Sequence, residues 1–264
     1  MADTTKADRT RLHYSTLLAP IYRWMLGDFP SAIERSRAEL GELGVGAARQ
    51  GARALDLGAG LGLQTIPLVE LGYEVTAVDS SEALLSELSA ACPQARAVLA
   101  DLAAGDEYFT GTYELILCMG DTLTHLHSDD EVRTVLEAAS AHLAPRGLLI
   151  LTFRDYTGLP RRSTDRFILV RGDPERILTC FLEYGADRIL VTDVVHERSA
   201  GRWSLRASEY EKLRLAPSAV TAELSARGLT VDRCDSIDGR VAIAAHRTAA
   251  PDQLRLSEPQ RHIL

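Results

Sequence analysis

The chain has 264 residues, of which 46% are hydrophobic and 25% are charged, proportions that are ordinary for a soluble globular protein. The formal net charge of −8 argues against nucleic acid or an anionic membrane as the main partner. No apolar run approaches the ~20 residues of a membrane span, and the polar amino-terminal sequence lacks the apolar core of a signal peptide. We therefore expect a cytoplasmic protein.

The four cysteines are far apart in the sequence and form no CxxC pair: Cys92, Cys118, Cys180 and Cys234. A zinc site or a disulfide framework would need closer or paired spacings. We expect all four cysteines to be reduced, and we expect no metal site.

The amino-terminal region is predicted to be loose up to about residue 11 and helical beyond it. Apolar residues recur there at helical spacing, Pro20 interrupts them, and Tyr14, Tyr22 and Trp24 make the segment unusually aromatic. Two interpretations stay open for this helix: it packs on the domain, or it is a lid over a ligand that contributes a tyrosine hydroxyl. A second helix is predicted from about residue 31 to residue 43.

Strands and helices alternate from residue 52 onward. The predicted strands are 52–57, 73–78, 97–100, 114–119 and 147–153, and the predicted helices lie near 62–71, 81–91 and 129–143. This alternation indicates right-handed crossovers between parallel strands.

The rhythm changes between residues 160 and 215, where apolar and polar residues alternate without a good helix. Antiparallel strands are predicted at 177–184, 189–196 and 203–209. A helix at 218–227 and two closing strands near 229–236 and 240–246 follow, and such a closing hairpin adds an antiparallel strand to a parallel sheet.

These patterns predict an α/β fold with a Rossmann-like sheet of seven mostly parallel strands and helices on both faces. A small antiparallel β insertion follows the fifth strand. The main domain is expected to comprise residues 1–158 and 216–250, the insertion residues 159–215, and a flexible tail residues 251–264.

The first predicted strand ends in Asp56 and runs into a turn with Gly58, Gly60 and Gly62. A turn without Cβ atoms lets a ligand approach the backbone closely. A dinucleotide fingerprint would require its third glycine where this chain has Leu63, and the Asp56 carboxylate would repel a pyrophosphate. The same carboxylate suits the ammonium group of S-adenosylmethionine, directly or through water. Spacing and charge thus favour that cofactor, with a tight turn that binds nothing as the alternative.

Acidic residues also end the second and third strands. Asp79, followed by Ser80, can accept hydrogen bonds from both ribose hydroxyls. Asp101 can accept from an adenine amino group, and the backbone amide of Leu102 can donate to a ring nitrogen. Each aspartate taken singly is also explained as a helix-capping or strand-end residue, but three strands ending in aspartate indicate a shared adenosine site.

The fourth and fifth strands end in residues suited to a methyl acceptor. In the loop after the fourth strand, Gly120 permits close approach, and Asp121 and His125 offer polar groups. Arg154, at the end of the fifth strand, is suited to bind a carboxylate through a bidentate fork. A salt bridge from Arg154 to Asp155 is the alternative.

Four segments carry a resemblance to a known family: LGDF at 26–29, VDSSEALL at 78–85, CMGDTLTHL at 118–126 and FRDY at 153–156. With the glycine turn, they make the chain resemble the class I S-adenosylmethionine-dependent methyltransferases over residues 52–156 and 217–246. Among these it is most similar to the glycine/sarcosine N-methyltransferase group.

This resemblance implies the following cofactor contacts: Gly58, Gly60 and Gly62 to the methionine part, Asp79 to the ribose, Asp101 and Leu102 to the adenine, and the backbone of Met119 beside the cofactor. The group has an arginine where this chain has Ala32, and Tyr22 or Arg23 could replace it in holding the cofactor carboxylate.

The resemblance also implies a substrate site. Asp121 stands where the group has a polar amide, and His125 matches a histidine of the same loop. Arg154 matches the arginine that grips the substrate carboxylate, Tyr156 follows it as in the group, and Tyr210 matches an active-site tyrosine of the insertion.

The predicted activity is methyl transfer from S-adenosylmethionine to a small molecule by in-line displacement, with S-adenosylhomocysteine as product and without a metal. The expected substrate is an amine or an amino-acid-like molecule that carries a carboxylate, with neither nucleic acid nor membrane as partner. Methylation at oxygen or sulfur, cofactor binding without turnover, and an NAD-linked oxidoreductase are the alternatives. Whether the chain forms a homo-oligomer is left open.

Overall fold

The computed structural model describes residues 6–160, 162–237 and 239–247. Its larger sheet has seven strands in the order β10-β11-β5-β4-β1-β2-β3. The strands are β1 Arg53–Leu57, β2 Glu74–Asp79, β3 Arg96–Leu99, β4 Tyr113–Cys118, β5 Leu143–Arg154, β10 Leu229–Ile237 and β11 Arg240–Arg247. The first five are parallel, and β11 pairs antiparallel with both β5 and β10. The predicted Rossmann-like sheet with a closing hairpin is confirmed.

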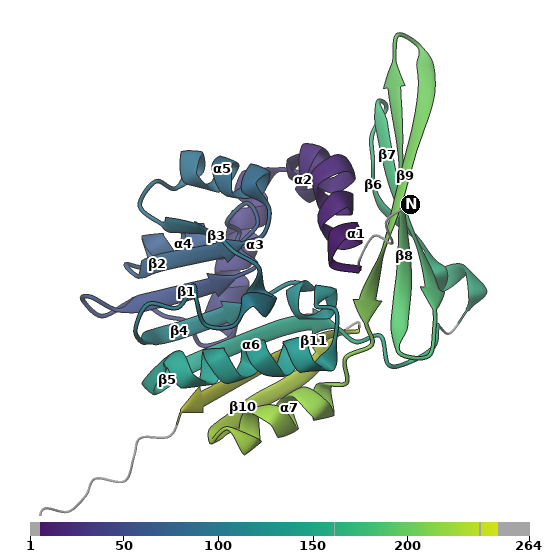
Figure 1. The fold of residues 1–264 in the computed structure, drawn as a ribbon. Helices are drawn as coiled ribbons and strands as arrows, with labels where there is room; N and C mark the ends of the chain where they lie inside the picture. The colour runs from purple at the N-terminus through teal and green to yellow at the C-terminus, as the bar shows by residue number, and fades with distance from the viewer. Residues whose placement is uncertain (1–5, 161, 238, 248–264) are drawn as a thin grey trace, which may run out of the picture.

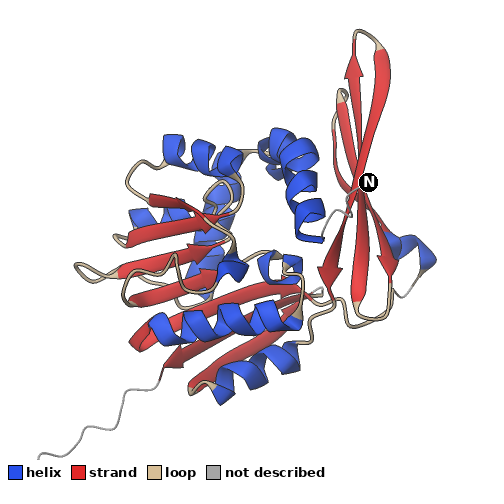
Figure 2. Cartoon of the chain, viewed as in Figure 1, coloured by secondary structure: helices blue, strands red, loops and turns tan. Residues whose placement is uncertain are grey.

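Helices cover both faces of this sheet (Figures 1 and 2). They are α3 Phe29–Glu42, α4 Thr65–Glu70, α5 Glu82–Ala91, α6 Asp129–His142 and α7 Pro217–Ala226. Alternate residues of a strand point to opposite faces. In β4, Ile116 joins the cluster under α6 and α7, whereas Leu117 joins the cluster under α3 and α4. Both faces of the strand are therefore buried, as expected for a parallel sheet.

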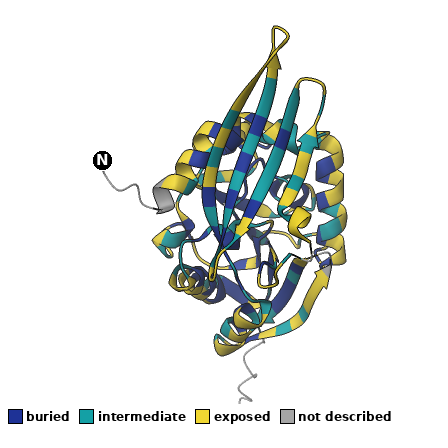
Figure 3. Ribbon diagram, turned by 90° about the vertical axis from the view of Figure 1, so that its right-hand side faces the viewer, coloured by how far each residue is buried: buried dark blue, intermediate teal, exposed yellow. Residues whose placement is uncertain are grey.

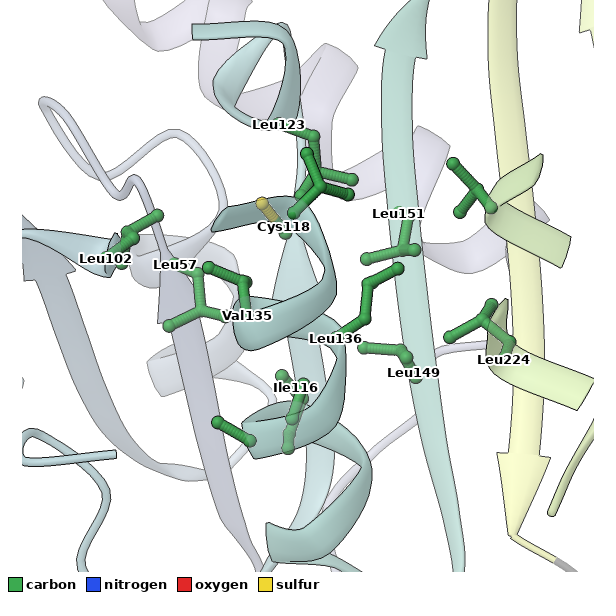
Figure 4. Packing of buried hydrophobic residues seen from close by; sticks show 14 of the residues in the cluster. Leu57, Leu102, Ile116, Cys118, Leu123, Val135, Leu136, Leu149, Leu151 and Leu224 are labelled. Carbon is green, nitrogen blue, oxygen red and sulfur yellow. The ribbon is translucent and has the colours of Figure 1, made fainter. Parts of the chain in front are cut away.

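Figure 4 shows the first of these clusters, where helix α6 lies across the sheet. Val135 and Leu136 of α6 pack with Ile116 of β4 and Leu149 of β5, all at most 1% exposed, and Leu224 of α7 closes the same cluster. This packing holds the ends of the strands in place, because a close-packed core has few voids into which a strand could shift.

A separate antiparallel sheet of four strands forms between β5 and α7, with the order β6-β7-β8-β9. Its strands are β6 Phe167–Gly172, β7 Arg176–Tyr184, β8 Arg188–Ser199 and β9 Arg202–Leu213. Three were predicted, whereas β6 was not, because its apolar run is short and lacks clear alternation. Figure 3 shows buried residues alternating with less buried ones along these strands, and in β8 buried and intermediate residues alternate strictly from Arg188 to Val195.

The amino-terminal region differs from the prediction. Residues near the start are helical rather than loose, since α1 spans Lys6–His13 and continues through a π-helical turn, Tyr14–Leu18, into α2, Ala19–Leu26. Pro20 lies in the first turn of α2, directly after the π-helical turn. These helices lie between the carboxyl edge of the parallel strands and the antiparallel sheet (Figure 1).

The chain order of the larger sheet reverses between β1 and β4, because β2 and β3 lie on one side of β1 and β4 and β5 on the other. In open α/β sheets, ligands bind outside the carboxyl ends of the strands at such a point. The predicted tail at 251–264 lies outside the described residues. Within the described ranges, no helix is both long enough and apolar enough to span a membrane.

Candidate active site

A cavity of about 1170 Å³ lies at the carboxyl edge of the parallel strands. It is lined by the turns after β1 to β5, by helices α1 to α3, and by one face of the antiparallel sheet. The larger sheet thus supplies one wall and the antiparallel sheet the opposite wall, with the amino-terminal helices between them (Figure 1).

The glycine turn after β1 is built for close packing on one side and open space on the other. Gly58, Gly60 and Gly62 all have positive φ, at 79°, 53° and 86°. A Cβ at Gly58 would collide with Thr122, and one at Gly62 would collide with Leu88. A Cβ at Gly60 would meet nothing within 4 Å. Gly60 lines the cavity, so its backbone is available to a ligand.

Asp79 at the end of β2 links this turn to helix α5. Its Oδ2 accepts from the Gly60 amide at 2.8 Å, and its Oδ1 accepts from the Ser81 amide at 2.8 Å. Burial raises the pKa of Asp79, and these amide hydrogen bonds oppose the rise. A carboxylate has about four acceptor sites, so Asp79 retains capacity for ribose hydroxyls. Ser80 also lines the cavity.

Asp56 lies behind the glycine turn and does not line the cavity. It is 1% exposed, and its Oδ2 accepts from the Thr65 hydroxyl at 2.6 Å. Burial raises its pKa to about 6. The glycine turn therefore lies between the Asp56 carboxylate and the cavity, and the contact with an ammonium group, directly or through water, stays a prediction.

The predicted adenine contacts lie together at one end of the cavity. Asp101 is exposed there, and its Oδ2 lies 3.5 Å from the Arg11 guanidinium of α1. Leu102 is buried and lines the same region, as does Leu84 of α5. Tyr22 of α2 packs beside Leu84, and burial, with the Asp79 charge as a lesser cause, raises its pKa to about 12.

The loop after β4 forms the centre of the cavity. Met119 is buried and lines it, and a Cβ at Gly120 would meet nothing within 4 Å. The Gly120 amide donates to the Thr152 hydroxyl of β5 at 2.7 Å, which holds the loop against the sheet. Gly120 is therefore, after Gly60, a second glycine of the cavity lining whose backbone faces open space.

Asp121 forms an ion pair that joins the two sheets. Its Oδ2 accepts from Lys212 Nζ of β9 at 2.6 Å, and its Oδ1 accepts from the backbone amide of Arg154 at 2.9 Å. Burial disfavours the charged form, but the Lys212 ammonium outweighs it and holds the Asp121 pKa at about 2. Burial likewise opposes the Lys212 charge, and Asp121 raises the Lys212 pKa. The charge that the sequence placed at Asp121 is therefore neutralised.

Aromatic rings surround His125 in the same loop. The Tyr14 hydroxyl lies 3.5 Å from its Nδ1, and the Tyr210 ring centroid is 5.3 Å from its own. Burial, with the Lys212 charge as a lesser cause, lowers the His125 pKa to about 3. The imidazole is therefore neutral at physiological pH.

The π-helical turn of the amino-terminal region is tied to the antiparallel sheet. His13 is fully buried, its Nε2 lies 3.1 Å from Asp193 Oδ2 of β8, and its ring centroid lies 4.3 Å from that of Tyr210 of β9, with the two rings tilted by 33°. Tyr14 follows directly and lines the cavity. The helix therefore packs on the protein and brings Tyr14 and Tyr22 to the cavity, and its role as a lid stays a prediction.

Arg154 is exposed, lines the cavity and is not held by a neighbour. Among the described residues its guanidinium has no hydrogen bond or ion pair, and the Asp155 salt bridge considered above does not form. Tyr156 lies on the same side, with its hydroxyl 3.4 Å from Lys212 Nζ. The described residues contain no group of three or more His, Cys, Asp and Glu side chains able to hold a metal.

Ala32 is buried and lines the cavity, and the residues suggested as substitutes for an arginine there are placed differently. Arg23 pairs with Glu87 at 3.6 Å and lies outside the lining, whereas Tyr22 is within it. On helix α3, which carries Ala32, the cation that lines the cavity is Arg35, one turn further on.

Sequence reasoning missed two residues that line the cavity, Lys212 and Asp193, and the buried His13 that contacts Asp193. A signal existed for two of them. Lys212 lies two positions after Tyr210, and Asp193 two after Val191, so period-2 alternation places each on the apolar face of its strand. A charged residue there needs a partner. Their partners, Asp121 and His13, are distant in the sequence and only the fold identifies them.

Comparison with known proteins shows which proteins this chain resembles. Residues 54–147 match a protein-family model described as a methyltransferase domain. The glycine/sarcosine N-methyltransferase of Halorhodospira halochloris is 30% identical over 115 residues, 42% of this chain and 43% of that protein. The protein of the same name from Aphanothece halophytica is 32% identical over 108 residues, 39% of this chain and 41% of that protein. The chain thus matches less than half the length of these relatives.

A solved structure described as an S-adenosylmethionine-dependent methyltransferase from Clostridium acetobutylicum has a TM-score of 0.68 to this chain. It is 16% identical and covers 93% of this chain and 100% of its own, a likeness that shows the fold alone. The predicted resemblance to the S-adenosylmethionine-dependent methyltransferases, and within them to the glycine/sarcosine N-methyltransferase group, is confirmed.

Asp56→Asn should change how stability depends on pH. The folded pKa of about 6 lies above the ordinary value of 3.8, so the native state keeps a proton that the unfolded state loses as the pH rises between these values. Wild-type stability therefore falls across this window, by about 2 kcal/mol between pH 4.5 and pH 7.5. The variant has no carboxyl group to titrate at this position. Urea unfolding should therefore show that its free energy of unfolding, relative to that of wild type, rises by this amount between pH 4.5 and pH 7.5. Parallel pH profiles would contradict the prediction.

Lys212→Met should lower the free energy of unfolding by on the order of 3 kcal/mol, because it leaves the Asp121 carboxylate without its cation. The double variant Asp121→Asn with Lys212→Met should recover more than half of that loss, since neither charge is left alone. Urea unfolding of both variants and of Asp121→Asn completes the cycle. Simply additive losses would show that the pair does not couple the two sheets.

Proposed function

We propose that this chain, whose residues 54–147 match a methyltransferase domain, transfers the methyl group of S-adenosylmethionine to the nitrogen of a small amine that carries a carboxylate. Its relatives named glycine/sarcosine N-methyltransferase support the reaction class. They match only part of the chain, so the argument for the substrate depends on the cavity itself.

The observation that carries the proposal is that one cavity joins two chemically different ends. One end has the open backbone at Gly60, the Asp79 carboxylate and the apolar Leu102. The other end has Arg154, Tyr156 and Tyr210. The first suits the amino-acid, ribose and adenine parts of the cofactor, and the second suits a polar acceptor.

The residues of the first end fit the cofactor. Open space beside Gly60 and Gly120 admits a ligand against the backbone, and Asp79 has acceptor sites left for hydroxyls. Arg35 is the cation on α3 that can meet the cofactor carboxylate in place of the arginine missing at Ala32. The cofactor supplies an activated methyl group on a sulfonium, so no metal or covalent enzyme intermediate is required.

The protein contributes alignment and exclusion of water. Tyr14, which lies near His125, and Tyr210, which packs against His13, line the centre of the cavity. Tyr210 is 6% exposed, and among the described residues its hydroxyl has no hydrogen-bond partner, so it can orient an acceptor nitrogen.

The amine must lose its proton before attack. Asp121, with a pKa of about 2 and both oxygens engaged, is a weak base. His125, with a pKa of about 3, is equally weak but offers a neutral ring. We therefore infer that the amine loses its proton to solvent before it binds. The rate of methylation should then rise with pH, because the neutral amine becomes more abundant.

Calorimetry with S-adenosylhomocysteine, joined to a methylation assay over small amines, alcohols and thiols, tests the proposal. The expected result is binding of S-adenosylhomocysteine together with an N-methylated product. A product methylated at oxygen or sulfur would show that the substrate is an alcohol or a thiol rather than an amine. Binding of S-adenosylhomocysteine without any product would favour a non-catalytic role. Tight binding of NAD with no binding of S-adenosylhomocysteine would overturn the proposal.

Arg154→Ala should raise KM for a carboxylate-bearing amine by about tenfold, because a charge-assisted hydrogen bond contributes roughly 1.5–3 kcal/mol. KM for S-adenosylmethionine should change less than twofold. Steady-state kinetics with each ligand varied in turn measures both. Arg202→Ala, which removes an exposed arginine outside the cavity, is the matched control. Equal effects of Arg154→Ala on both KM values would show that Arg154 does not bind the substrate carboxylate.

A further inference from the structure

The wall of the cavity that faces away from the glycine turn is apolar. It is one face of the antiparallel sheet, on which Ile168 of β6 lies opposite Cys180 of β7, and Leu182 of β7 lies opposite Val191 of β8. All four line the cavity, and Leu182 and Val191 are at most 4% exposed. A ligand against this wall meets carbon and sulfur rather than polar atoms.

The charged residues of the same face are already paired. Asp193 contacts His13, and Lys212 forms the ion pair with Asp121. Two polar groups suited to an acceptor at this end, the Arg154 guanidinium and the Tyr210 hydroxyl, have no hydrogen bond among the described residues. Two polar contacts beside an extended apolar wall suit an amphiphilic molecule.

The apolar wall continues to the mouth of the cavity along the edge strand β6. Its pairing with β7 shifts register between Leu169 and Arg171. Consecutive residues of a regular strand point to opposite faces, yet Ile168, Leu169 and Val170 all line the cavity. A bulge of this kind re-aims side chains, often beside active sites. It leaves Leu169 67% exposed and Val170 41% exposed.

We propose that the methyl acceptor is an amine with an apolar body that lies along this wall and leaves the cavity past Leu169 and Val170. This inference builds on the proposed function and specifies its substrate class. The amine lies near Tyr210, a carboxylate pairs with Arg154, and an aliphatic or aromatic group covers Ile168, Leu169 and Val170. Glycine would reach the polar groups but would leave the exposed Leu169 and Val170 uncovered.

The first experiment compares glycine, L-leucine and L-phenylalanine as acceptors in the methylation assay. Each buried methylene in an apolar pocket favours the larger substrate by roughly 10-fold or more. We therefore expect kcat/KM to be at least tenfold higher for L-leucine or L-phenylalanine than for glycine. Equal or better use of glycine would overturn this inference while leaving the proposed function standing.

The second experiment changes the mouth with Leu169→Asp. The side chain is mostly exposed, so the fold should tolerate the change, and KM for L-phenylalanine should rise about fivefold to tenfold while kcat changes less than twofold. Leu205→Asp is the matched control, because Leu205 is an apolar residue of β9 that is 59% exposed and does not line the cavity. Equal effects of both variants would overturn the inference.

Two further readouts separate the remaining outcomes. Calorimetry of the protein loaded with S-adenosylhomocysteine, titrated with L-phenylalanine and with glycine, measures occupancy without turnover. Preferential binding of L-phenylalanine without any methylated product would contradict the proposed function but support the apolar acceptor site. Binding of neither amino acid would overturn the inference about the acceptor site. If light scattering shows that Leu169→Asp dissociates a dimer while KM is unchanged, a second copy of the chain covers this strand and the inference fails.

Discussion

The ion pair between Asp121 and Lys212 is the interaction on which the arrangement of the cavity depends. Lys212 Nζ lies 2.6 Å from Asp121 Oδ2, and the other oxygen of Asp121 holds the amide of Arg154. One carboxylate therefore joins the loop after β4, the end of β5 and strand β9. Two charges with little solvent contact are costly unless they are paired, so the two sheets keep a fixed relation at this point.

The same pairing determines what chemistry the cavity can perform. Asp121 is held ionised but neutralised, and burial keeps the His125 imidazole neutral. Near the centre of the cavity, neither group is a strong base at neutral pH. Such a site can align two reactants and exclude water, which is what a transfer reaction with an already activated methyl group needs. In the proposed reaction we expect selectivity to come from contacts further out, at Arg154 and along the antiparallel sheet.

The amino-terminal helices complete this arrangement through a second buried pair. His13 contacts Asp193 and its ring lies tilted against Tyr210, and the next residue, Tyr14, lies beside His125. A π-helical turn begins at Tyr14 between α1 and α2, and such turns are frequent at functional sites. The helices are thus anchored on the antiparallel sheet while their tyrosines face the cavity.

The sequence alone determined the alternation of strands and helices, the glycine turn and the acidic strand ends, because these depend on local spacing and on the absence of Cβ atoms. It predicted Asp79, Asp101 and Arg154 in positions that the fold brings to one cavity. Only the tertiary structure decided that Asp56 lies behind the turn, that Lys212 neutralises Asp121, and that β6 exists and bulges toward the cavity. Each of these depends on contacts between segments far apart in the chain. A spacing rule cannot supply them, because the charge, the burial and the direction of a side chain are set by what packs against it.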